Sequence, residues 1–566
     1  MNTTERGRPD PPVGKAYILG LPVEMLRHIL ENLEYAVPDD ADAASDAAQI
    51  AKDESIGNIK NCRLVCKQFH DQSSHMLLRA VEISCLPSSI QRFHEISRHP
   101  TIRMGIQTVN VSLRLYQSEL AKDINTFVQQ FADEFFDLFT FTGWQGGDTD
   151  VELIRIEKAR AIWDVWVQSY YPDAWHYHSQ SEGAENEDDW EADNCYQALI
   201  EGIYHEYRRR FEEQESAIGS GEFVRAVAWG MASMPFARTL RFGDGESSSN
   251  LGNSAFHRLD PFHDYRFACV FNHSEQDVGD ALSQCLLTMR TGRDNSGLCP
   301  SQPLRPVADV VVHLLAAIAD AGSRPTAIEI SLGLYPLAGL SVTSQEMRES
   351  LCLVGEELKV FKFDCTDEYW LNERETDAAS RCESRMDDMN EVLTACLQSS
   401  TKLQSLTLSI DSYEGYLYNL DHDVEELELI WNNLGPTLTS RTWKKLKHSR
   451  LDGLRLSLSD LALFVRNLPS SPHGVSLSFE NMTLTTGTWA GALRILREES
   501  SAAVEFGAMK ATGVIDREVA GWVEDMFAAK DASGREVVKR YVNDRADNVE
   551  NPFPDGGGAS NSLRMI

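Results

Sequence analysis

Two short stretches near the start of the chain carry apolar residues at helical spacing. In the first, four large aliphatic side chains recur at i, i+3, i+4 and i+7, which places them on one stripe of an α-helix. They are Leu26, Ile29, Leu30 and Leu33. Pro22 precedes the stripe, in a first turn that does not need the missing backbone N–H. The pattern therefore predicts an amphipathic helix that begins near Pro22.

The second stretch repeats this stripe after an acidic, alanine-rich insert at residues 35–57. Its apolar positions are Ile59, Cys62, Val65, Cys66 and Phe69. Two or three helices of this size bury little surface, and a chain below about 40 residues usually needs outside help to fold. We therefore interpret the two stretches as a docking element whose apolar face is completed by another protein. The alternative is an ordinary helical hairpin that belongs to a larger core.

Alternating aliphatic residues recur along the rest of the chain and predict a series of short strands. These strands are expected at residues 80–84, 108–116, 237–242, 326–334, 359–365, 403–410, 451–459, 473–482 and 502–509. Helical patterns lie between many of them, at residues 90–97, 196–214, 307–321, 386–399, 424–434, 461–467 and 489–499. This alternation of strands and helices predicts an α/β protein.

A Leu-x-x-Leu-x-Leu pattern occurs twice among the predicted strands. This spacing directs the second and third leucines into a shared core. The two occurrences are Leu403-Leu406-Leu408 and Leu451-Leu454-Leu456. The last three strands begin 22 and 29 residues apart, within the 20–29 residues of a leucine-rich repeat. The region resembles irregular leucine-rich repeats, and a compact α/β domain with ordinary βαβ crossovers is the alternative.

The two N-terminal stretches resemble an F-box. The chain reads Leu-Pro-x-Glu-x-Leu, then Ile-Leu-x-x-Leu, and after the insert Arg-Leu-Val-Cys-Lys-x-Phe, in the order of that motif. The resemblance covers residues 17–84, and the 35–57 insert between its halves departs from the usual pattern. It implies that ten residues form the F-box core and the adaptor-facing surface: Leu21, Pro22, Leu26, Ile29, Leu30, Leu33, Leu64, Val65, Cys66 and Phe69.

An F-box implies binding to the Skp adaptor, and through it to the cullin, of an SCF-type ubiquitin ligase. The rest of the chain would then capture a protein substrate. We therefore expect a substrate-recognition subunit without bond chemistry of its own, because ubiquitin transfer takes place in other subunits. The main alternative is a non-ligase repeat scaffold for protein–protein interactions, whose helical N-terminus packs on its own repeat region. An enzyme whose catalytic groups lie far apart in the sequence comes third.

The predicted architecture is an N-terminal helical F-box followed by an irregular leucine-rich-repeat-like α/β solenoid with long helical insertions. We divide the chain into a disordered leader (1–16), an F-box-like unit (17–84), a helical, aromatic-rich region (85–235) with an acidic loop (179–194), a repeat region (236–545) and a disordered tail (546–566). The aromatic residues of the third segment are interpreted as core, with a partner-binding patch as the alternative. They include Trp163, Trp166, Tyr170, Tyr171, Trp175, Tyr177 and Trp190.

Charge and cysteine content narrow the function classes further. The formal net charge of −33 argues against binding to nucleic acid or to anionic membranes, both of which select an excess of Lys and Arg. We interpret this acidity as a solubility feature. The 11 cysteines show no disulfide framework, and no run approaches the roughly 18 apolar residues of a membrane span. A cytoplasmic or nuclear location is therefore expected.

Motifs for catalysis and cofactor binding are not recognised in the sequence. There is no Gly-x-Ser-x-Gly elbow, His-Glu-x-x-His helix, phosphate-binding loop or dinucleotide fingerprint. Cys62, Cys66 and His70 have the spacing of one helix face, but a fourth metal ligand is missing, so we interpret the cysteines as packing residues. His176 and His178, beside the acidic loop, are interpreted as a solvated segment. We expect neither a metal nor a cofactor.

Overall fold

The computed structural model describes the chain in segments separated by gaps. The described residues are 25–26, 57–113, 115–116, 118–127, 190–243, 307–333, 342–367, 378–412, 434–469, 475–500, 503–506, 509–510 and 532–544. Among them, no helix has both the length and the apolar character needed to cross a membrane. The predicted leader, the predicted tail, and most of the 35–57 insert and of the acidic loop lie outside the described residues.

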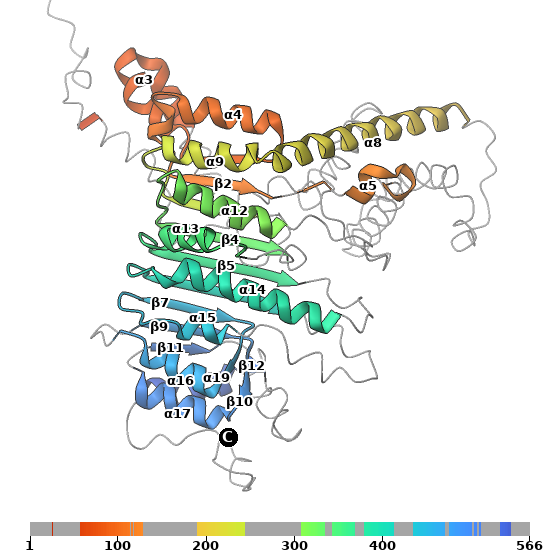
Figure 1. The fold of residues 1–566 in the computed structure, drawn as a ribbon. Helices are drawn as coiled ribbons and strands as arrows, with labels where there is room; N and C mark the ends of the chain where they lie inside the picture. The colour runs from red at the N-terminus through yellow and green to blue at the C-terminus, as the bar shows by residue number, and fades with distance from the viewer. Residues whose placement is uncertain are drawn as a thin grey trace, which may run out of the picture.

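Nine strands form one sheet in which every pair of neighbours is parallel (Figure 1). They follow one another across the sheet in the order of the sequence. The strands are β1 (Ala80–Ser84), β2 (Thr108–Ser112), β3 (Thr239–Gly243), β4 (Ala327–Gly333), β5 (Val360–Asp367), β6 (Ser405–Ser412), β7 (His448–Asp452), β9 (Ser476–Glu480) and β11 (Ala503–Phe506). The α/β prediction is confirmed, and each of the nine predicted strands overlaps one of these.

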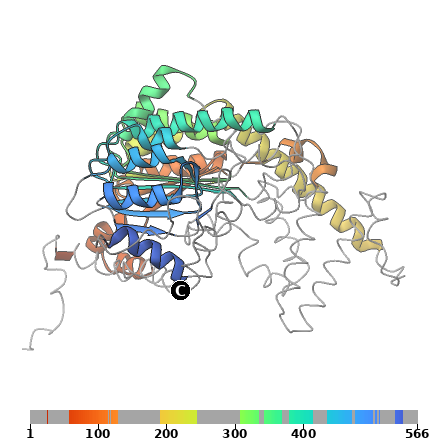
Figure 2. The same cartoon turned by 90° about the horizontal axis from the view of Figure 1, so that it is seen from below.

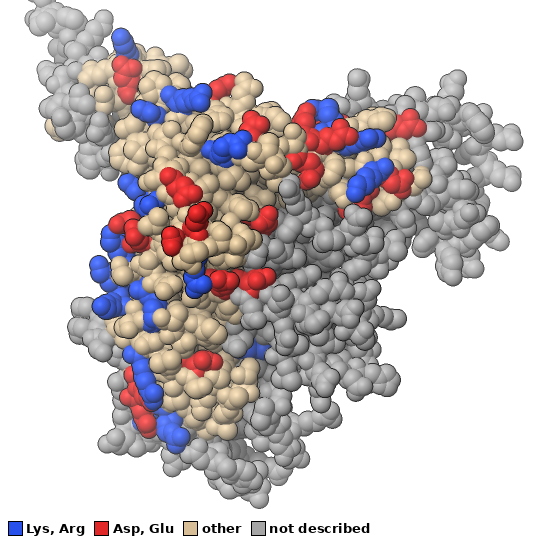
Figure 3. Space-filling model, in the orientation of Figure 1, with Lys and Arg blue, Asp and Glu red and all other residues tan. Residues whose placement is uncertain are grey.

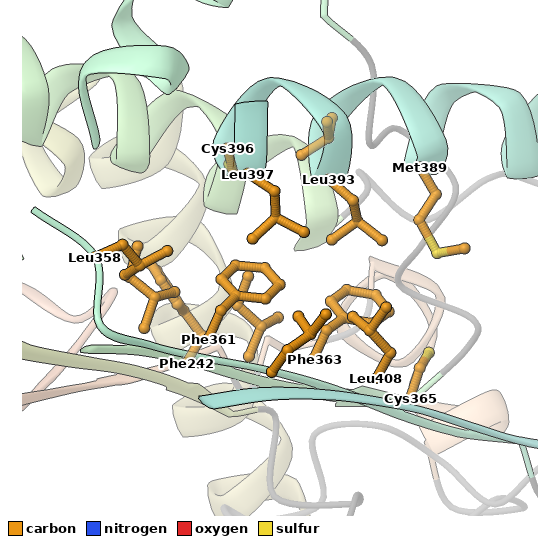
Figure 4. Packing of buried hydrophobic residues seen from close by; sticks show 14 of the residues in the cluster. Phe242, Leu358, Phe361, Phe363, Cys365, Met389, Leu393, Cys396, Leu397 and Leu408 are labelled. Atoms are coloured by element: carbon orange, nitrogen blue, oxygen red, sulfur yellow. The ribbon is translucent and has the colours of Figure 1, made fainter. Parts of the chain in front are cut away.

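The register of the sheet aligns its buried side chains in rows that run from strand to strand. Alternate residues of a strand point to the same face, and residues in register on neighbouring strands stand side by side. One such row consists of Ile83, Val111, Phe242, Ile330, Phe363, Leu408, Leu451 and Phe479. All eight are at most 3% exposed. In Figure 4, Phe363 and Leu408 of this row point toward Leu393 on the covering helix.

Eight helices form a layer against this buried face. They are α4 (Pro87–Arg98), α9 (Glu222–Ser233), α12 (Val307–Asp320), α13 (Gln345–Gly355), α14 (Ala378–Gln398), α15 (Gly435–Thr439), α16 (Leu458–Arg466) and α17 (Trp489–Glu499). Each helix packs against the next one in the sequence. Figure 2 shows the green and teal helices, α12 to α14, together on one side of the strands. Helices and strands therefore follow the same order in space.

Side chains fix the start of several of these helices. Ser344 and Thr488 each accept a hydrogen bond from a backbone N–H of the first turn, at 3.1 Å in both cases. Ser457 and Asp460 form a reciprocal capping box at the start of α16. Caps of this kind contribute about 1 kcal/mol each because they satisfy N–H groups that have no partner within the helix.

The last three predicted strands are each divided in two, so their predicted extents, such as 451–459, are wrong. After β7 and β9 the chain turns at Gly453 (φ 65°) and Asn481 (φ 49°), in the left-handed region that glycine and asparagine adopt most readily. The second halves are β8 (Arg455–Ser457), β10 (Met482–Thr486) and β12 (Met509–Lys510), and they form a separate parallel sheet. Leu454 and Leu456 are buried beyond the turn.

Helix α8 (Trp190–Gly219) extends away from the sheet beside α5 (Ser118–Lys122) (Figure 1). The Tyr204 hydroxyl donates a 3.0 Å hydrogen bond to the Ala121 carbonyl, and the Tyr207 ring lies 5.0 Å from the ring of Tyr116. A hydrogen bond thus joins α8 to α5, and aromatic packing joins α8 to the residue Tyr116 that precedes α5. The other tryptophans and tyrosines of the predicted aromatic region, from Trp163 to Tyr177, lie outside the described residues. Residues 190–194, predicted as part of the acidic loop, are helical instead.

The sheet crosses two of the predicted domain boundaries. Strand β1 lies inside the predicted F-box unit (17–84), and β2 lies inside the predicted helical region (85–235), yet both belong to the nine-stranded sheet. The reason is the continuous backbone ladder, which joins β1 to β2 and β2 to β3 in register. The nine-stranded sheet therefore begins at Ala80, within the predicted F-box-like unit.

Helix α19 (Ala532–Asn543) closes the last edge of the sheet. The side-chain amide of Asn543 donates to the Val504 carbonyl and accepts from the Val504 N–H, both at 2.8 Å. One asparagine thus satisfies both outward-facing backbone groups of a residue in β11. The Arg497 guanidinium, 4.5 Å from the centre of the Tyr541 ring, ties the same helix to α17. The sequence interpretation did not identify this helix.

We expect Asn543→Ala to loosen the β11 edge. The change removes two hydrogen bonds to partly buried backbone groups and should lower local stability by about 1–3 kcal/mol. Amide exchange of residues 503–506, measured by mass spectrometry, should accelerate. The control is Arg540→Ala, an exposed change on the same helix. Equal exchange in the Asn543 variant and the wild type would show that the amide does not hold this edge.

Candidate functional site

A small apolar cluster near the N-terminus is separate from the core under the sheet. Its buried members are Leu26, Ile59, Phe69 and Met76. Cys62, Cys66 and Leu77 pack against them and are partly buried. None of these residues belongs to the large cluster between the sheet and its helices. The N-terminal helices therefore have a core of their own, which we call the small core.

Local sequence explains how the chain surrounds the small core. A helix covers residues 57–65 and stops at Cys66, whose backbone is extended (φ −165°, ψ 169°). Helix α3 (Lys67–Ser73) follows at once, and the 3-10 turn η1 (Ser74–Met76) brings Met76 back to the cluster. The Arg63 Nε group donates to the Ser74 hydroxyl at 3.2 Å, which links the first helix to η1.

Large apolar side chains stand in solvent on the same unit. Leu64 is 85% exposed, Val65 is 65% exposed and Met25 is 53% exposed. Single exposed aliphatic residues are common on protein surfaces, but neighbouring ones on a unit this small form a patch that a partner can cover. Leu64 and Val65 are the last two residues of the 57–65 helix, directly before the break at Cys66. We call Met25, Leu64 and Val65 the apolar patch.

Five of the ten predicted site residues are described, and they divide into two groups. Leu26 and Phe69 point into the small core, with Cys66 partly buried beside them. Leu64 and Val65 point outward. Val65 thus leaves the predicted apolar stripe: it is one position from Cys66, about 100° away around a helix. The other five lie outside the described residues: Leu21, Pro22, Ile29, Leu30 and Leu33.

The sequence interpretation missed two apolar residues of the N-terminal unit. Met76 closes the small core, but it follows a run of polar residues that carries no helical periodicity. Met25 belongs to the apolar patch, and its position directly before Leu26 was the available signal. A residue next to a buried stripe position lies about 100° away around a helix, so a large apolar side chain there is exposed.

The unit is attached to the sheet region at one tight contact. The turn η1 packs against the 3-10 turn η2 (Ile102–Met104), which leads through Gly105 to β2. A Cβ atom at Gly105 would lie 1.5 Å from the carbonyl oxygen of His75, so only glycine fits this position. The small core and the sheet are therefore separate apolar clusters joined through a close backbone contact.

Polar groups of the unit do not form a metal centre. The cysteines at 62 and 66 pack against the small core, and the Arg63 Nη2 atom lies 3.1 Å from His70 Nε2. A guanidinium beside the imidazole disfavours a bound cation. Throughout the described ranges, no three His, Cys, Asp or Glu side chains are grouped so that they could hold a metal ion.

Comparisons with known proteins do not extend this description. No family model matches the chain, and neither does any curated protein or any solved structure. The chemistry that the site offers therefore comes from the geometry alone. It consists of an apolar patch, formed on a small helical unit with its own core.

We expect Phe69→Ala to disrupt the small core without unfolding the sheet. Phe69 is 7% exposed, and removing a buried phenyl ring costs about 3 kcal/mol or more. Amide exchange should accelerate throughout residues 57–76 and stay unchanged in residues 360–365. Leu64→Ala is the matched control, because truncating an exposed side chain changes stability by less than about 0.5 kcal/mol. Acceleration in both segments would mean that the two clusters form one cooperative core.

Proposed function

We propose that this protein is the substrate-recognition subunit of an SCF-type cullin-RING ubiquitin ligase. The N-terminal unit binds the Skp adaptor, and the sheet region binds the protein to be modified. The observation that carries the proposal is the exposure of Leu64 and Val65 on a helical unit most of whose other described apolar residues pack in the small core. Both residues belong to the Arg-Leu-Val-Cys-Lys-x-Phe half of the F-box-like motif.

The energetics of the apolar patch support an adaptor-docking role. Moving one leucine or valine side chain from water to a buried position yields roughly 1.5–3 kcal/mol. Leu64 and Val65 together therefore offer at least about 3 kcal/mol, a hundredfold or more in affinity. Because the small core holds the unit together before a partner arrives, little of this free energy is spent on folding it. An adaptor with a matching apolar groove would gain from both side chains.

The arrangement of the sheet supports the finer fold assignment, an irregular leucine-rich-repeat-like solenoid. Its strands and its helices are both neighbours in sequence order, so each strand-helix unit contacts mainly the units before and after it. A doubly wound domain would place helices on both faces instead. A side-chain hydrogen bond also links two of the last units. Asn481 Nδ2, in the turn after β9, donates to Asp452 Oδ1 at the end of β7, at 2.9 Å.

A non-ligase scaffold is the second candidate. The close contact between Gly105 and His75 favours it, because this contact fixes the N-terminal unit against the chain's own sheet region. In a scaffold the unit would remain attached when the protein is partly digested, and the apolar patch would bind no adaptor. In a receptor the unit would bind the adaptor whether or not the sheet region is occupied.

We expect the double variant Leu64→Asp, Val65→Asp to lose adaptor capture. Two carboxylates in an apolar groove remove the burial described above, so binding should weaken by about a hundredfold or more. The measurement is a titration of purified Skp adaptor against the immobilised full chain. Since both side chains are exposed, the melting temperature of the variant should match that of the wild type.

Leu463→Asp is the control for this titration, because Leu463 is 45% exposed on α16, within the helix layer. This variant should capture the adaptor as the wild type does. Undiminished capture by the Leu64, Val65 double variant would refute the proposed docking surface. Absence of capture by the wild type would favour the scaffold.

A further inference from the structure

Basic residues precede alternate strands of the sheet at its amino-terminal edge. The residue before each strand is joined to the residue before the next by a backbone N–H to carbonyl hydrogen bond of 2.7–2.9 Å. From β1 to β7, these residues are Arg79, Gln107, Arg238, Thr326, Lys359, Gln404 and Lys447. Every second one is cationic. We call Arg79, Arg238, Lys359 and Lys447 the cationic ladder.

The spacing of the cationic ladder is fixed by the sheet. Neighbouring strands lie about 4.8 Å apart, so the backbone positions of cations on alternate strands lie about 10 Å apart. An extended polypeptide advances about 3.3 Å per residue, and every third residue is therefore also separated by about 10 Å. An acidic residue at every third position of an extended segment would meet one cation after another along the edge.

The ladder stands out against the charge of the whole chain, which is −33. Arg238, Lys359 and Lys447 are exposed. Figure 3 shows blue side chains along the left edge of the molecule, where the strands of Figure 1 begin. Within the described part of the chain, none of these three residues forms an ion pair. Their charges are therefore available to a partner.

Arg238 Nη1 donates to the Arg324 carbonyl at 3.3 Å, and other cations at this edge have a structural role that Lys359 and Lys447 lack. The Arg324 Nη1 group donates to the Ala319 carbonyl at 2.7 Å, and the Arg441 Nη1 group donates to the Leu397 carbonyl at 2.6 Å. Both therefore satisfy carbonyl groups at the carboxyl ends of helices, where positive charge is favourable. Lys359 and Lys447 make no such contact among the described residues, so helix capping does not explain why they are basic.

One carboxylate of the chain itself, that of Glu357, lies close enough to these cations to feel their charge. Glu357 forms an ion pair with Lys402. The hydrogen bond from Lys402 lowers the pKa of Glu357 below its ordinary value, and the charges of Arg238 and Lys359 lower it further. The ionised form of the Glu357 carboxylate is thus favoured here. Carboxylates of a second molecule would meet the same field.

From these observations we infer that the cationic ladder binds an extended acidic segment of a partner protein, with Asp or Glu at about every third residue. Phe236, 53% exposed, and Val360, 36% exposed, flank Arg238 and Lys359 in the sequence and offer apolar contact beside the charges. A nucleic acid is disfavoured because the net charge of the chain repels it. In the proposed receptor the acidic segment belongs to the captured substrate, and this assignment rests on the proposed function.

The test measures binding of fluorescein-labelled 12-residue Gly-Ser peptides to the full chain by anisotropy at physiological salt. One peptide carries four glutamates at every third position, and the other carries the same four side by side. The spaced peptide should bind more tightly. The triple variant Arg238→Gln, Lys359→Gln, Lys447→Gln should weaken its binding by about tenfold, as expected for three exposed ion pairs removed together.

The control variant Arg208→Gln, Lys539→Gln, Arg540→Gln removes the same charge from helices α8 and α19 and should leave the affinity unchanged. The inference is overturned if the triple ladder variant binds as the wild type does, if both peptides bind alike, or if a dodecathymidine strand binds more tightly than the spaced peptide. Adaptor capture by the ladder variant is measured in parallel. Its retention separates loss of this surface from failure of the receptor assignment.

Discussion

The hydrogen-bond ladder between strands that are consecutive in the sequence organises this protein. Every strand of the main sheet is parallel to the strands before and after it. Each connecting segment must therefore return to the end of the sheet at which the strands begin. Because the strands are also added in sequence order and such crossovers have one hand, the helices between them cover one face, and the buried side chains align in rows across the strands. The separate positions of the N-terminal helical unit, the cationic ladder and α19 all follow from this order.

Much of the fold can be predicted from the sequence, because a strand buried on one face must alternate apolar and polar residues. All nine strands of the main sheet were found in this way, and the predicted helix at residues 489–499 matches α17. The ends of the late strands were not found. Gly453 and Asn481 turn the chain within runs that still alternate, and a turn at a single residue interrupts the backbone without interrupting the pattern. Helix α13 has mixed polar and apolar residues and was missed for that reason.

The candidate site could be predicted only in part, for a different reason. Periodicity identifies which residues belong together, and it correctly grouped Ile59 and Phe69 of the small core. It cannot reveal where a helix stops. The extended backbone at Cys66 ends the first helix and lets Phe69 approach the small core from a second helix. The position of this break, which places Phe69 in the small core, depends on tertiary contacts that the apolar pattern does not encode.

Asn543 limits the number of strands in the sheet by occupying its last edge. Its side chain occupies the two hydrogen-bonding positions that a tenth strand would use on Val504, and α19 carries it there from the far side of a long connection. A copy that lost α19 would leave this edge open to a strand from another molecule. A single amide thus protects this edge from pairing with a strand of another molecule.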